Sequence, residues 1–181
     1  GIDNDDWQKS KDYLIGFEGL LILDADALNR ISESKLGSKF FLERKFKTWI
    51  TPHTKEFSRL FPNIKCETNV GQALKAAKDF NISVLLKGAN SIVADNKKAW
   101  QLYGTDSQTA RAGLGDLLSG FVAGSSAIDL TLCRNITTDF FAKYVLLHSY
   151  AASKCKKGST ASLIADELSK LMRKSKVRQM S

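Results

Sequence analysis

The chain has 181 residues, of which 43% are hydrophobic and 25% are charged. This length and balance are typical of one globular domain with a hydrophobic core, and they exclude a disordered or fibrous chain. No apolar run approaches the roughly 18 residues of a membrane span, and the opening stretch GIDNDDWQKSK lacks the apolar core of a signal peptide. We therefore expect no membrane partner.

The formal net charge is +8, from 27 Lys and Arg against 19 Asp and Glu. A basic balance suits an anionic partner such as a nucleotide, but much of the excess lies in KLMRKSKVRQMS, and a basic tail is usually a solvated helix face. No aromatic-basic surface for stacking bases stands out, so nucleic acid is not the expected partner. Three widely spaced cysteines, Cys66, Cys133 and Cys155, indicate reduced thiols and a cytoplasmic setting rather than a disulfide framework or a zinc site.

Short apolar runs alternate with helical patterns in the first part of the chain. EGLLILDADALN predicts a buried strand over Leu20–Leu23 that ends in acids and leads into a helix. FKTWITPH predicts a second short strand that ends at Thr51 and Pro52, and KEFSRLF predicts a helical turn. NVGQALKAAKDF predicts an amphipathic helix, whose inner face carries Leu74, Ala77 and Phe80.

Further along the chain the pattern changes from strands to helices. ISVLLKGANSIVAD predicts a buried strand, a Lys-Gly turn and another strand, and KAWQLYG alternates as an edge strand does. A loop from Thr105 to Gly115 follows. The remaining pattern predicts three helices, from Asp116 to about Ser126, from about Thr137 to Cys155, and from about Thr160 to Met172.

The alternation of strands and helices predicts an α/β fold, with a parallel sheet and helices on both of its faces. In such sheets, ligands bind outside the carboxyl ends of the strands. The loop before the Asp116 helix should approach the same edge. The residues expected at these strand ends are Asp24, Asp26, Thr51, His53, Lys87 and Gly88.

The stretch RAGLGDLLSG contains the strongest candidate site. Gly113, Gly115 and Asp116 precede an apolar helix, and the unpaired amides and dipole of a helix start bind anions. Glycines let the backbone approach a phosphate closely. A carboxylate beside a phosphate is useful if it takes a proton from a hydroxyl that attacks that phosphate. The alternative is that Asp116 only caps the helix and that the glycines only form a turn.

Lys87 and His53 each have two interpretations. Lys87 and Gly88 can contact phosphate, or they can form a simple hairpin turn. His53 can hydrogen-bond a substrate, with Glu56 capping the next helix or orienting a metal-bound water, or a cap around Thr54 can leave the histidine idle. His148, within the apolar helix FFAKYVLLHSYAAS, is best interpreted as a core histidine with its hydrogen bonds satisfied.

Six stretches of the sequence resemble, in the same order, those of the ADP/ATP-dependent NAD(P)H-hydrate dehydratases, which are ribokinase-like proteins. They are LILDADALN, ITPHTKEFSRLF, VLLKGANSIVAD, AGLGDLLSGFVAG, VLLHSYAASK and TASLIADEL. The resemblance runs from about Gly19 to Leu171. It implies a ribokinase-like three-layer αβα sandwich with a mostly parallel central sheet. This chain would be one such domain over residues 1–181, holding its C-terminal two-thirds.

The resemblance implies repair of hydrated NADH or NADPH (NADHX or NADPHX). In that reaction, the ring hydroxyl attacks the terminal phosphate of ATP or ADP, and phosphate then leaves to restore the nicotinamide double bond. Asp116 matches the family's acid, which implies a general base that also contacts the hydrate, and His53 matches a histidine that contacts the hydrate. The resemblance implies nucleotide contacts for Lys87, Gly88, Ala89, Asn90, Ser91, Gly113 and Gly115. Mg²⁺ is expected with the nucleotide, without a dedicated set of protein ligands.

The sequence departs from the family pattern at three places. Leu114 stands where the family has Thr, so a hydroxyl is missing beside the phosphate. Thr54 and Lys55 replace the Pro-Gly after the histidine. Thr105-Asp106-Ser107 replaces Gly-Asn-Pro and would put a negative charge near the nucleotide. These departures bear on nucleotide choice and turnover rate.

The family places a Gly-rich strand-turn-helix segment, which helps to hold the hydrate, well before LILDADALN. In this chain that motif begins at Leu21, so little of such a segment is present. We expect the sheet to have an uncovered edge that is completed by another chain or by a missing N-terminal segment. We also expect a homo-oligomer.

Two other functions are compatible with these residues. A ribokinase-like small-molecule kinase, of the hydroxyethylthiazole or hydroxymethylpyrimidine kinase type, would use the same Gly-x-Gly-Asp and release a stable phosphorylated alcohol. TPHTKE and DADALN together favour the dehydratase. A non-catalytic nucleotide- or nucleic-acid-binding fragment would fit the net charge and Leu114, and its nucleic-acid affinity would fall steeply with salt.

Overall fold

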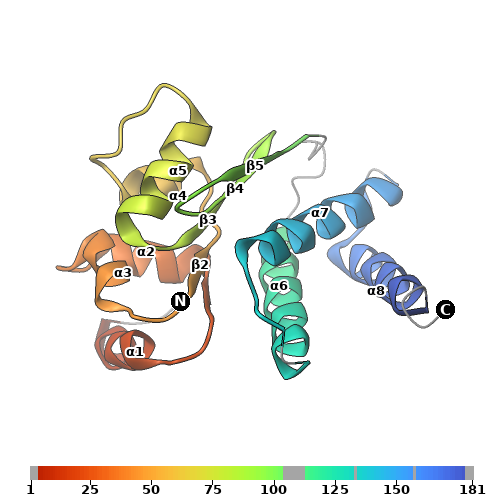
Figure 1. Cartoon of the computed structure of the whole chain (residues 1–181), viewed down its shortest axis with the longest axis horizontal. Helices are drawn as coiled ribbons and strands as arrows, with labels where there is room; N and C mark the ends of the chain where they lie inside the picture. Colours follow the sequence, from red (N-terminus) through yellow and green to blue (C-terminus); the bar gives the residue numbers. More distant parts are fainter. Residues whose placement is uncertain (1–3, 104–112, 133, 157, 178–181) are drawn as a thin grey trace. The chain divides into compact units, whose positions relative to one another are not determined.

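The computed structural model describes residues 4–103, 113–132, 134–156 and 158–177. The chain forms two compact units, Gly1–Tyr103 (unit 1) and Gly104–Ser181 (unit 2). Unit 1 combines strands and helices, and the described residues of unit 2 form helices (Figure 1). The assignment of residues 1–181 to one domain stays a prediction.

Unit 1 contains a sheet and several helices in alternation, as predicted. Its strands are β1 (Leu21–Leu23), β2 (Thr48–Ile50), β3 (Ser83–Leu86), β4 (Ser91–Ala94) and β5 (Ala99–Leu102). Its helices are α1 (Asn4–Gly16), α2 (Ala25–Glu33), the 3₁₀ turn η1 (Gly37–Lys39), α3 (Phe40–Glu43), α4 (Thr54–Leu60) and α5 (Asn69–Phe80).

The strands form one sheet in the order β1-β2-β3-β4-β5. β1, β2 and β3 pair in parallel, with Ile22 opposite Trp49 and Ile50 opposite Val84. β4 pairs antiparallel with both β3 and β5, so β5 points the same way as the first three strands. The prediction of a mostly parallel sheet is therefore confirmed, and β5 is an edge strand, as its alternating pattern indicated.

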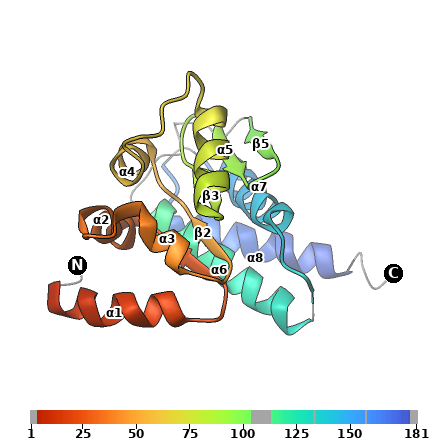
Figure 2. The same ribbon diagram turned by 60° about the vertical axis from the view of Figure 1, so that its left-hand side comes forward.

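The core of unit 1 lies between the sheet and its helices. All residues of β3 and β4 are buried, as expected of unbroken apolar runs. Ile50, Val84 and Ile92 join a core with helical side chains such as Phe57 and Ala76. Figure 2 shows α2 beside α4, and α5 along β3. This packing brings the carboxyl ends of β1, β2 and β3 next to one another.

Helix α5 forms where its sequence pattern predicts it. The Thr68 hydroxyl oxygen caps its start by accepting a hydrogen bond from the Gly71 amide at 3.0 Å, and Asn81 ends it in the left-handed conformation, with φ 50°. Ala77 is buried. Leu74 and Phe80 pack against the core beside it, so the predicted inner face is confirmed.

Two helical segments, α1 and α3, lie where the sequence analysis predicted none. The α1 sequence NDDWQKSKDYLIG is mostly polar, but Trp7 is 4% exposed and packs against Phe40 with ring centroids 6.4 Å apart. Arg44, just after α3, is buried and donates hydrogen bonds to the carbonyl oxygens of Leu14 and Gly19. Burial lowers the pKa of Arg44. Its hydrogen bonds tie the end of α1 to the segment before β2.

Unit 2 contains the three helices predicted for the second part of the chain. They are α6 (Leu114–Thr131), α7 (Thr138–Lys154) and α8 (Ala161–Val177). Helix α6 continues past the predicted end at Ser126. Every helix in the described part of the chain is too short or too polar to cross a lipid bilayer.

The helices of unit 2 pack through a small apolar core. Its buried residues are Ala151, Ala152, Ile164 and Leu168, and the side chains packed against them include Leu114, Leu117 and Phe121. Because Leu114 and Leu117 lie in the first turn of α6, this core holds the start of that helix against α7 and α8.

A buried polar cluster joins the end of α6 to α7. Asp129 is 7% exposed, accepts a hydrogen bond from the Tyr144 hydroxyl, and pairs with Arg134, whose Nη1 lies 2.6 Å from Asp129 Oδ1. Burial and the hydrogen bond to Asp129 raise the pKa of Tyr144. The phenol therefore stays protonated and acts as the donor to this carboxylate.

His148 is buried in α7, as predicted, but its hydrogen bonds are not all satisfied. The residue is 8% exposed, and its Nε2 has no hydrogen-bond partner among the described residues. Desolvation lowers the pKa of His148 from 6.5 to about 4. A neutral ring is therefore part of the folded state.

The pH dependence of stability should report this buried histidine. Below pH 6.5 the unfolded chain binds a proton at His148 that the folded chain does not take up until about pH 4. Acidification through this window therefore lowers the free energy of unfolding, by at most about 3 kcal/mol for this group. Urea unfolding at about pH 7 and about pH 4.5 measures the loss. A His148→Gln variant should lose less stability on acidification, and an identical loss in both proteins would contradict the prediction.

Candidate functional site

The carboxyl ends of β1, β2 and β3 meet at one edge of the unit 1 sheet. The Thr51 amide donates to the carbonyl oxygen of Leu23 at 3.1 Å, and the Lys87 amide donates to that of Pro52 at 2.8 Å. His53 and Lys87 form an isolated parallel bridge. Hydrogen bonds between strand ends thus fix the backbone on which several predicted site residues lie.

Lys87 forms an ion pair across this edge. Its Nζ lies 2.8 Å from Asp24 Oδ1, and the two side chains are 25% and 14% exposed. Asp24 is also the N-cap of α2, because the same oxygen accepts a hydrogen bond from the Ala25 amide at 2.9 Å. The structure therefore gives Asp24 a capping role and a partner 63 residues away in the sequence.

The turn from β1 into α2 is strained directly after Asp24. Ala25 has φ 47°, in the left-handed region that a residue with a Cβ adopts at a cost of about 1–2 kcal/mol. Strain of this kind persists only where the surrounding structure holds it in place. Here the strained residue leads directly from the strand into the helix that Asp24 caps.

His53 caps α4, although the sequence analysis placed a possible cap around Thr54. Its Nδ1 accepts hydrogen bonds from the amides of Lys55 at 3.0 Å and Glu56 at 3.3 Å, while Glu56 Oε2 accepts from the His53 amide at 2.8 Å. A ring nitrogen that accepts these bonds carries no proton, so the proton is on Nε2. The His53 side chain is 48% exposed, and its Nε2 lies 3.5 Å from Glu56 Oε1.

The predicted nucleotide-binding stretch Lys87–Ser91 is the hairpin between β3 and β4. Gly88, Ala89 and Asn90 are exposed, and the buried Ser91 hydroxyl donates to the Gly88 carbonyl oxygen at 3.3 Å. A Cβ atom added at Gly88 would meet no other atom within 4 Å. The described chain itself therefore does not require glycine at position 88.

The start of α6 holds the other predicted group of residues. Gly113 is the N-cap with φ 83°, a conformation that favours glycine, and no side-chain cap hydrogen bond is present among the described residues. Asp116 lies exposed in the first turn, near Gly115. No hydrogen bond or ion pair joins its carboxylate to another residue of the described ranges. The interpretation of Asp116 as only a helix cap does not match this geometry.

Each unit holds its own group of predicted site residues. His53 and Lys87–Ser91 belong to unit 1, and Gly113, Gly115 and Asp116 belong to unit 2. The variant loop Thr105-Asp106-Ser107 lies outside the described residues. Leu114, which replaces the family's Thr, packs its side chain against the core of unit 2.

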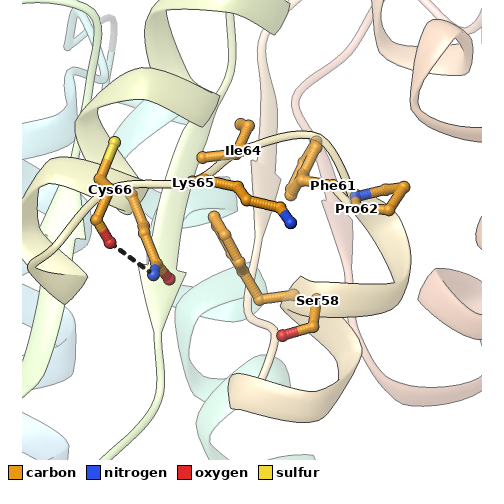
Figure 3. A pocket seen from close by; sticks show the side chains of 8 residues that line it. Ser58, Phe61, Pro62, Ile64, Lys65 and Cys66 are labelled. Atoms are coloured by element: carbon orange, nitrogen blue, oxygen red, sulfur yellow. Dashed lines mark hydrogen bonds between the residues drawn. The ribbon is translucent and has the colours of Figure 1, made fainter.

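Two recesses lie on unit 1, and neither is lined by His53 or by the hairpin residues 87–90. One, of about 370 Å³, is lined by Phe57, Ser58, Phe61, Pro62, Ile64, Lys65, Cys66 and Gln72. Figure 3 shows Lys65 extending across it between Phe61 and Ser58. The other, of about 350 Å³, lies between α2 and α4 and includes Asp26, which was expected at a strand end but lies in the first turn of α2. Within the described ranges, no three His, Cys, Asp or Glu side chains gather as metal ligands.

Sequence reasoning missed the pairing of Asp24 with Lys87 and the capping role of His53. The pairing depends on strand order, which no local pattern reports. The cap did have a local signal, because Glu56 follows His53 by three residues, which is the spacing of a capping box. Histidine is not among the usual N-cap residues.

The family model and the curated relatives that match this chain point to the same family. A family model described as NAD(P)H-hydrate dehydratase matches residues 1–174. A bifunctional NAD(P)H-hydrate repair enzyme of Gloeobacter violaceus is 38% identical over 118 residues, which are 65% of this chain and 22% of that protein. Its counterpart in Coxiella burnetii is 29% identical over 175 residues, which are 93% of this chain and 33% of that protein. The chain thus spans a third or less of these relatives.

Solved structures show the same fold. A ribokinase-like superfamily protein from Enterococcus faecalis matches with a TM-score of 0.78 at 21% identity, over 96% of this chain and 60% of that chain. An ADP/ATP-dependent NAD(P)H-hydrate dehydratase from Bacillus subtilis, co-crystallised with ATP and Mg²⁺, matches with a TM-score of 0.72 at 21% identity, over 94% of this chain and 60% of that chain. These matches confirm the predicted ribokinase-like α/β fold.

Proposed function

Because the chain belongs to the NAD(P)H-hydrate dehydratase family, we propose that it takes part in the ADP- or ATP-dependent dehydration of hydrated NADH and NADPH. The observation that carries the site assignment is the start of α6. There a glycine N-cap, the unpaired amides of a first helical turn, and an exposed carboxylate without a partner in the described chain lie within four residues. This arrangement suits a phosphate and a base beside it.

Asp116 is the proposed general base. Its carboxylate takes the proton of the ring hydroxyl as that oxygen forms a bond to the terminal phosphorus, and the bond from this phosphorus to the rest of the nucleotide breaks. The phosphorylated hydrate then loses phosphate and a ring proton, which restores the nicotinamide double bond. Because Asp116 is exposed, the hydroxyl of a bound hydrate can reach it.

Each unit has one glycine-containing segment that suits contact with a phosphate. In unit 1, the open space at Gly88 and the exposed Ala89 and Asn90 leave the hairpin backbone accessible to a phosphate or a ribose. In unit 2, the amides of the first turn of α6 offer hydrogen-bond donors, and the helix dipole favours an anion. The nucleotide supplies the phosphoryl group, and the protein residues position it.

Mg²⁺ is expected to be held by the nucleotide phosphates and water. Mg²⁺ keeps several waters and commonly binds through substrate phosphates with one or two carboxylates. The ADP/ATP-dependent NAD(P)H-hydrate dehydratase from Bacillus subtilis was co-crystallised with ATP and Mg²⁺, which supports this pairing for the present chain.

His53 is proposed to contact the hydrate through Nε2. His53→Asn keeps a side-chain oxygen that can cap α4 but removes the Nε2 donor, whereas His53→Ala removes both. Both variants should raise KM for the hydrate. Only His53→Ala should lower the free energy of unfolding, by about 1 kcal/mol. Steady-state kinetics and urea unfolding measure the two effects, and an unchanged KM in His53→Asn would contradict the substrate contact.

A small-molecule kinase is the second candidate, since the start of α6 would serve it equally well. The two functions differ in their products. Incubation with hydrated NADH should restore NADH absorbance only when ATP or ADP and Mg²⁺ are present. Failure to restore NADH, with formation of a stable phosphorylated alcohol from a thiazole or pyrimidine alcohol, would favour the kinase.

Cytoplasmic location, the choice between ATP and ADP, homo-oligomer formation and completion by another chain or segment remain predictions. The choice of nucleotide is measured by comparing kcat/KM for ATP and ADP. The molecular mass of the native sample measures both the oligomer and any companion chain.

A further inference from the structure

The Lys87 ammonium is paired with one carboxylate, and the Lys87 side chain is still partly exposed. Its ammonium has three N–H donors, and Asp24 is the partner that the described chain provides. The Lys87 side chain is 25% exposed, so the remaining donors are accessible to a ligand. The ammonium therefore lies fixed at the strand edge with unused donors, immediately before the exposed Gly88.

Asp24 is itself held firmly, which makes it suited to fixing another side chain. Its Oδ1 accepts from the Ala25 amide at 2.9 Å and from Lys87 Nζ at 2.8 Å. It stands between β1 and the left-handed Ala25, at the entry to α2. Lysine has a long, flexible side chain, so an unheld ammonium would lose much conformational freedom on binding a phosphate. A carboxylate that orders it beforehand lowers this entropic penalty.

The same carboxylate also opposes anion binding by its charge. Asp24 is 14% exposed, so its charge is only partly screened by water, and it neutralises part of the Lys87 charge. The two effects of Asp24 therefore predict opposite results on its removal. If ordering dominates, phosphate binding weakens, and if neutralisation dominates, phosphate binding strengthens.

We infer that Asp24 is a positioning residue, which holds the Lys87 ammonium in place for the phosphate groups of the nucleotide. The strained turn at Ala25 and the cap on α2 hold the Asp24 carboxylate in place. One of its oxygens accepts hydrogen bonds from both the Ala25 amide and the Lys87 ammonium. This inference rests on the proposed nucleotide site at Lys87–Ser91. Asp24 itself need not touch the nucleotide, since it acts through Lys87.

A double-mutant cycle on nucleotide affinity tests this inference. Asp24→Asn keeps an oxygen that caps α2 but removes the charge, and Lys87→Met removes the ammonium. ADP with Mg²⁺ is titrated against the full chain, the two single variants and the double variant at one ionic strength. Asp24→Asn should weaken ADP binding by at least about threefold in the presence of Lys87, and by less than about 1.5-fold when position 87 is Met. Asp24→Ser, which also caps, replaces Asp24→Asn if that variant does not fold.

The outcomes separate the inference from the proposed function. Tighter ADP binding by Asp24→Asn, or an equal change in both backgrounds, would overturn the positioning role while leaving the nucleotide site intact. No ADP binding by the unmodified chain would overturn the nucleotide site and the inference together. Unchanged affinity in Lys87→Met would overturn the contact of Lys87 with the nucleotide, and with it the inference. Loss of stability should not explain the coupling in ADP affinity, because Asn and Ser at position 24 both preserve the cap on α2. Urea midpoints of the four proteins check this.

Discussion

Replacing Asp116 by Asn should lower the turnover number of the dehydration by about 100-fold to 10,000-fold, the usual contribution of a positioned general base. Asn has the same shape but does not accept the proton of the attacking hydroxyl. Because the Asp116 carboxylate has no partner in the described chain and does not cap α6, the free energy of unfolding should change little. The measurements are the rate of NADH recovery at saturating hydrate and nucleotide, ADP affinity, and the urea midpoint.

Asp139→Asn is a matched control for this variant. Asp139 is also an exposed acid in the first turn of a long helix of unit 2, α7. The control therefore removes one negative charge at an equivalent helical position and should leave turnover unchanged. Equal losses in Asp116→Asn and Asp139→Asn would indicate a general effect of charge, and normal turnover in Asp116→Asn would exclude Asp116 as the base.

The second large effect is expected on stability, at Asp129. Asp129→Ala removes the acceptor of the Tyr144 hydroxyl and the partner of Arg134 in a buried site. The phenol would be left buried without its acceptor, so the free energy of unfolding should fall by about 3 kcal/mol. Urea unfolding at neutral pH measures the change.

Arg134→Ala provides the comparison. The Arg134 side chain is 41% exposed, so water can replace part of its contact with Asp129. Its loss should lower the free energy of unfolding less, by about 1 kcal/mol, and leave the Tyr144 hydrogen bond in place. A smaller loss in Asp129→Ala than in Arg134→Ala would contradict the importance of the buried phenol–carboxylate bond.

Local sequence patterns predicted the strands and most helices of this fold, for physical reasons that individual elements show. β3 and β4 are unbroken apolar runs that are buried along their length, and α5 has both a helical apolar period and a Thr cap. α1 was missed because its sequence is mostly polar and its packing depends chiefly on Trp7. α6 was predicted too short because Ser126 and Asp129 are buried polar residues, which interrupt the apolar period.

The candidate site was only partly predictable, since its contacts join distant segments. The glycine N-cap at Gly113 and the position of Asp116 in the first turn follow from a local motif. The ion pair of Lys87 with Asp24 does not, because it depends on β1 and β3 flanking β2 in the sheet. The burial of Leu114 against α7 and α8 residues also depends on tertiary packing. The resemblance to a family predicted the roles of individual residues, and only the fold showed which residues contact them.

The ratio of NADH restored to phosphate released tests the proposed function most directly. Hydrated NADH is incubated with the chain, ATP and Mg²⁺, and NADH absorbance and free phosphate are followed in the same sample, with a sample lacking hydrate as the blank. Phosphorylation followed by elimination predicts one phosphate for each NADH restored, with no increase in NADH when nucleotide is omitted. Phosphate release without NADH, or a phosphorylated hydrate that accumulates as the final product, would contradict the proposed dehydratase.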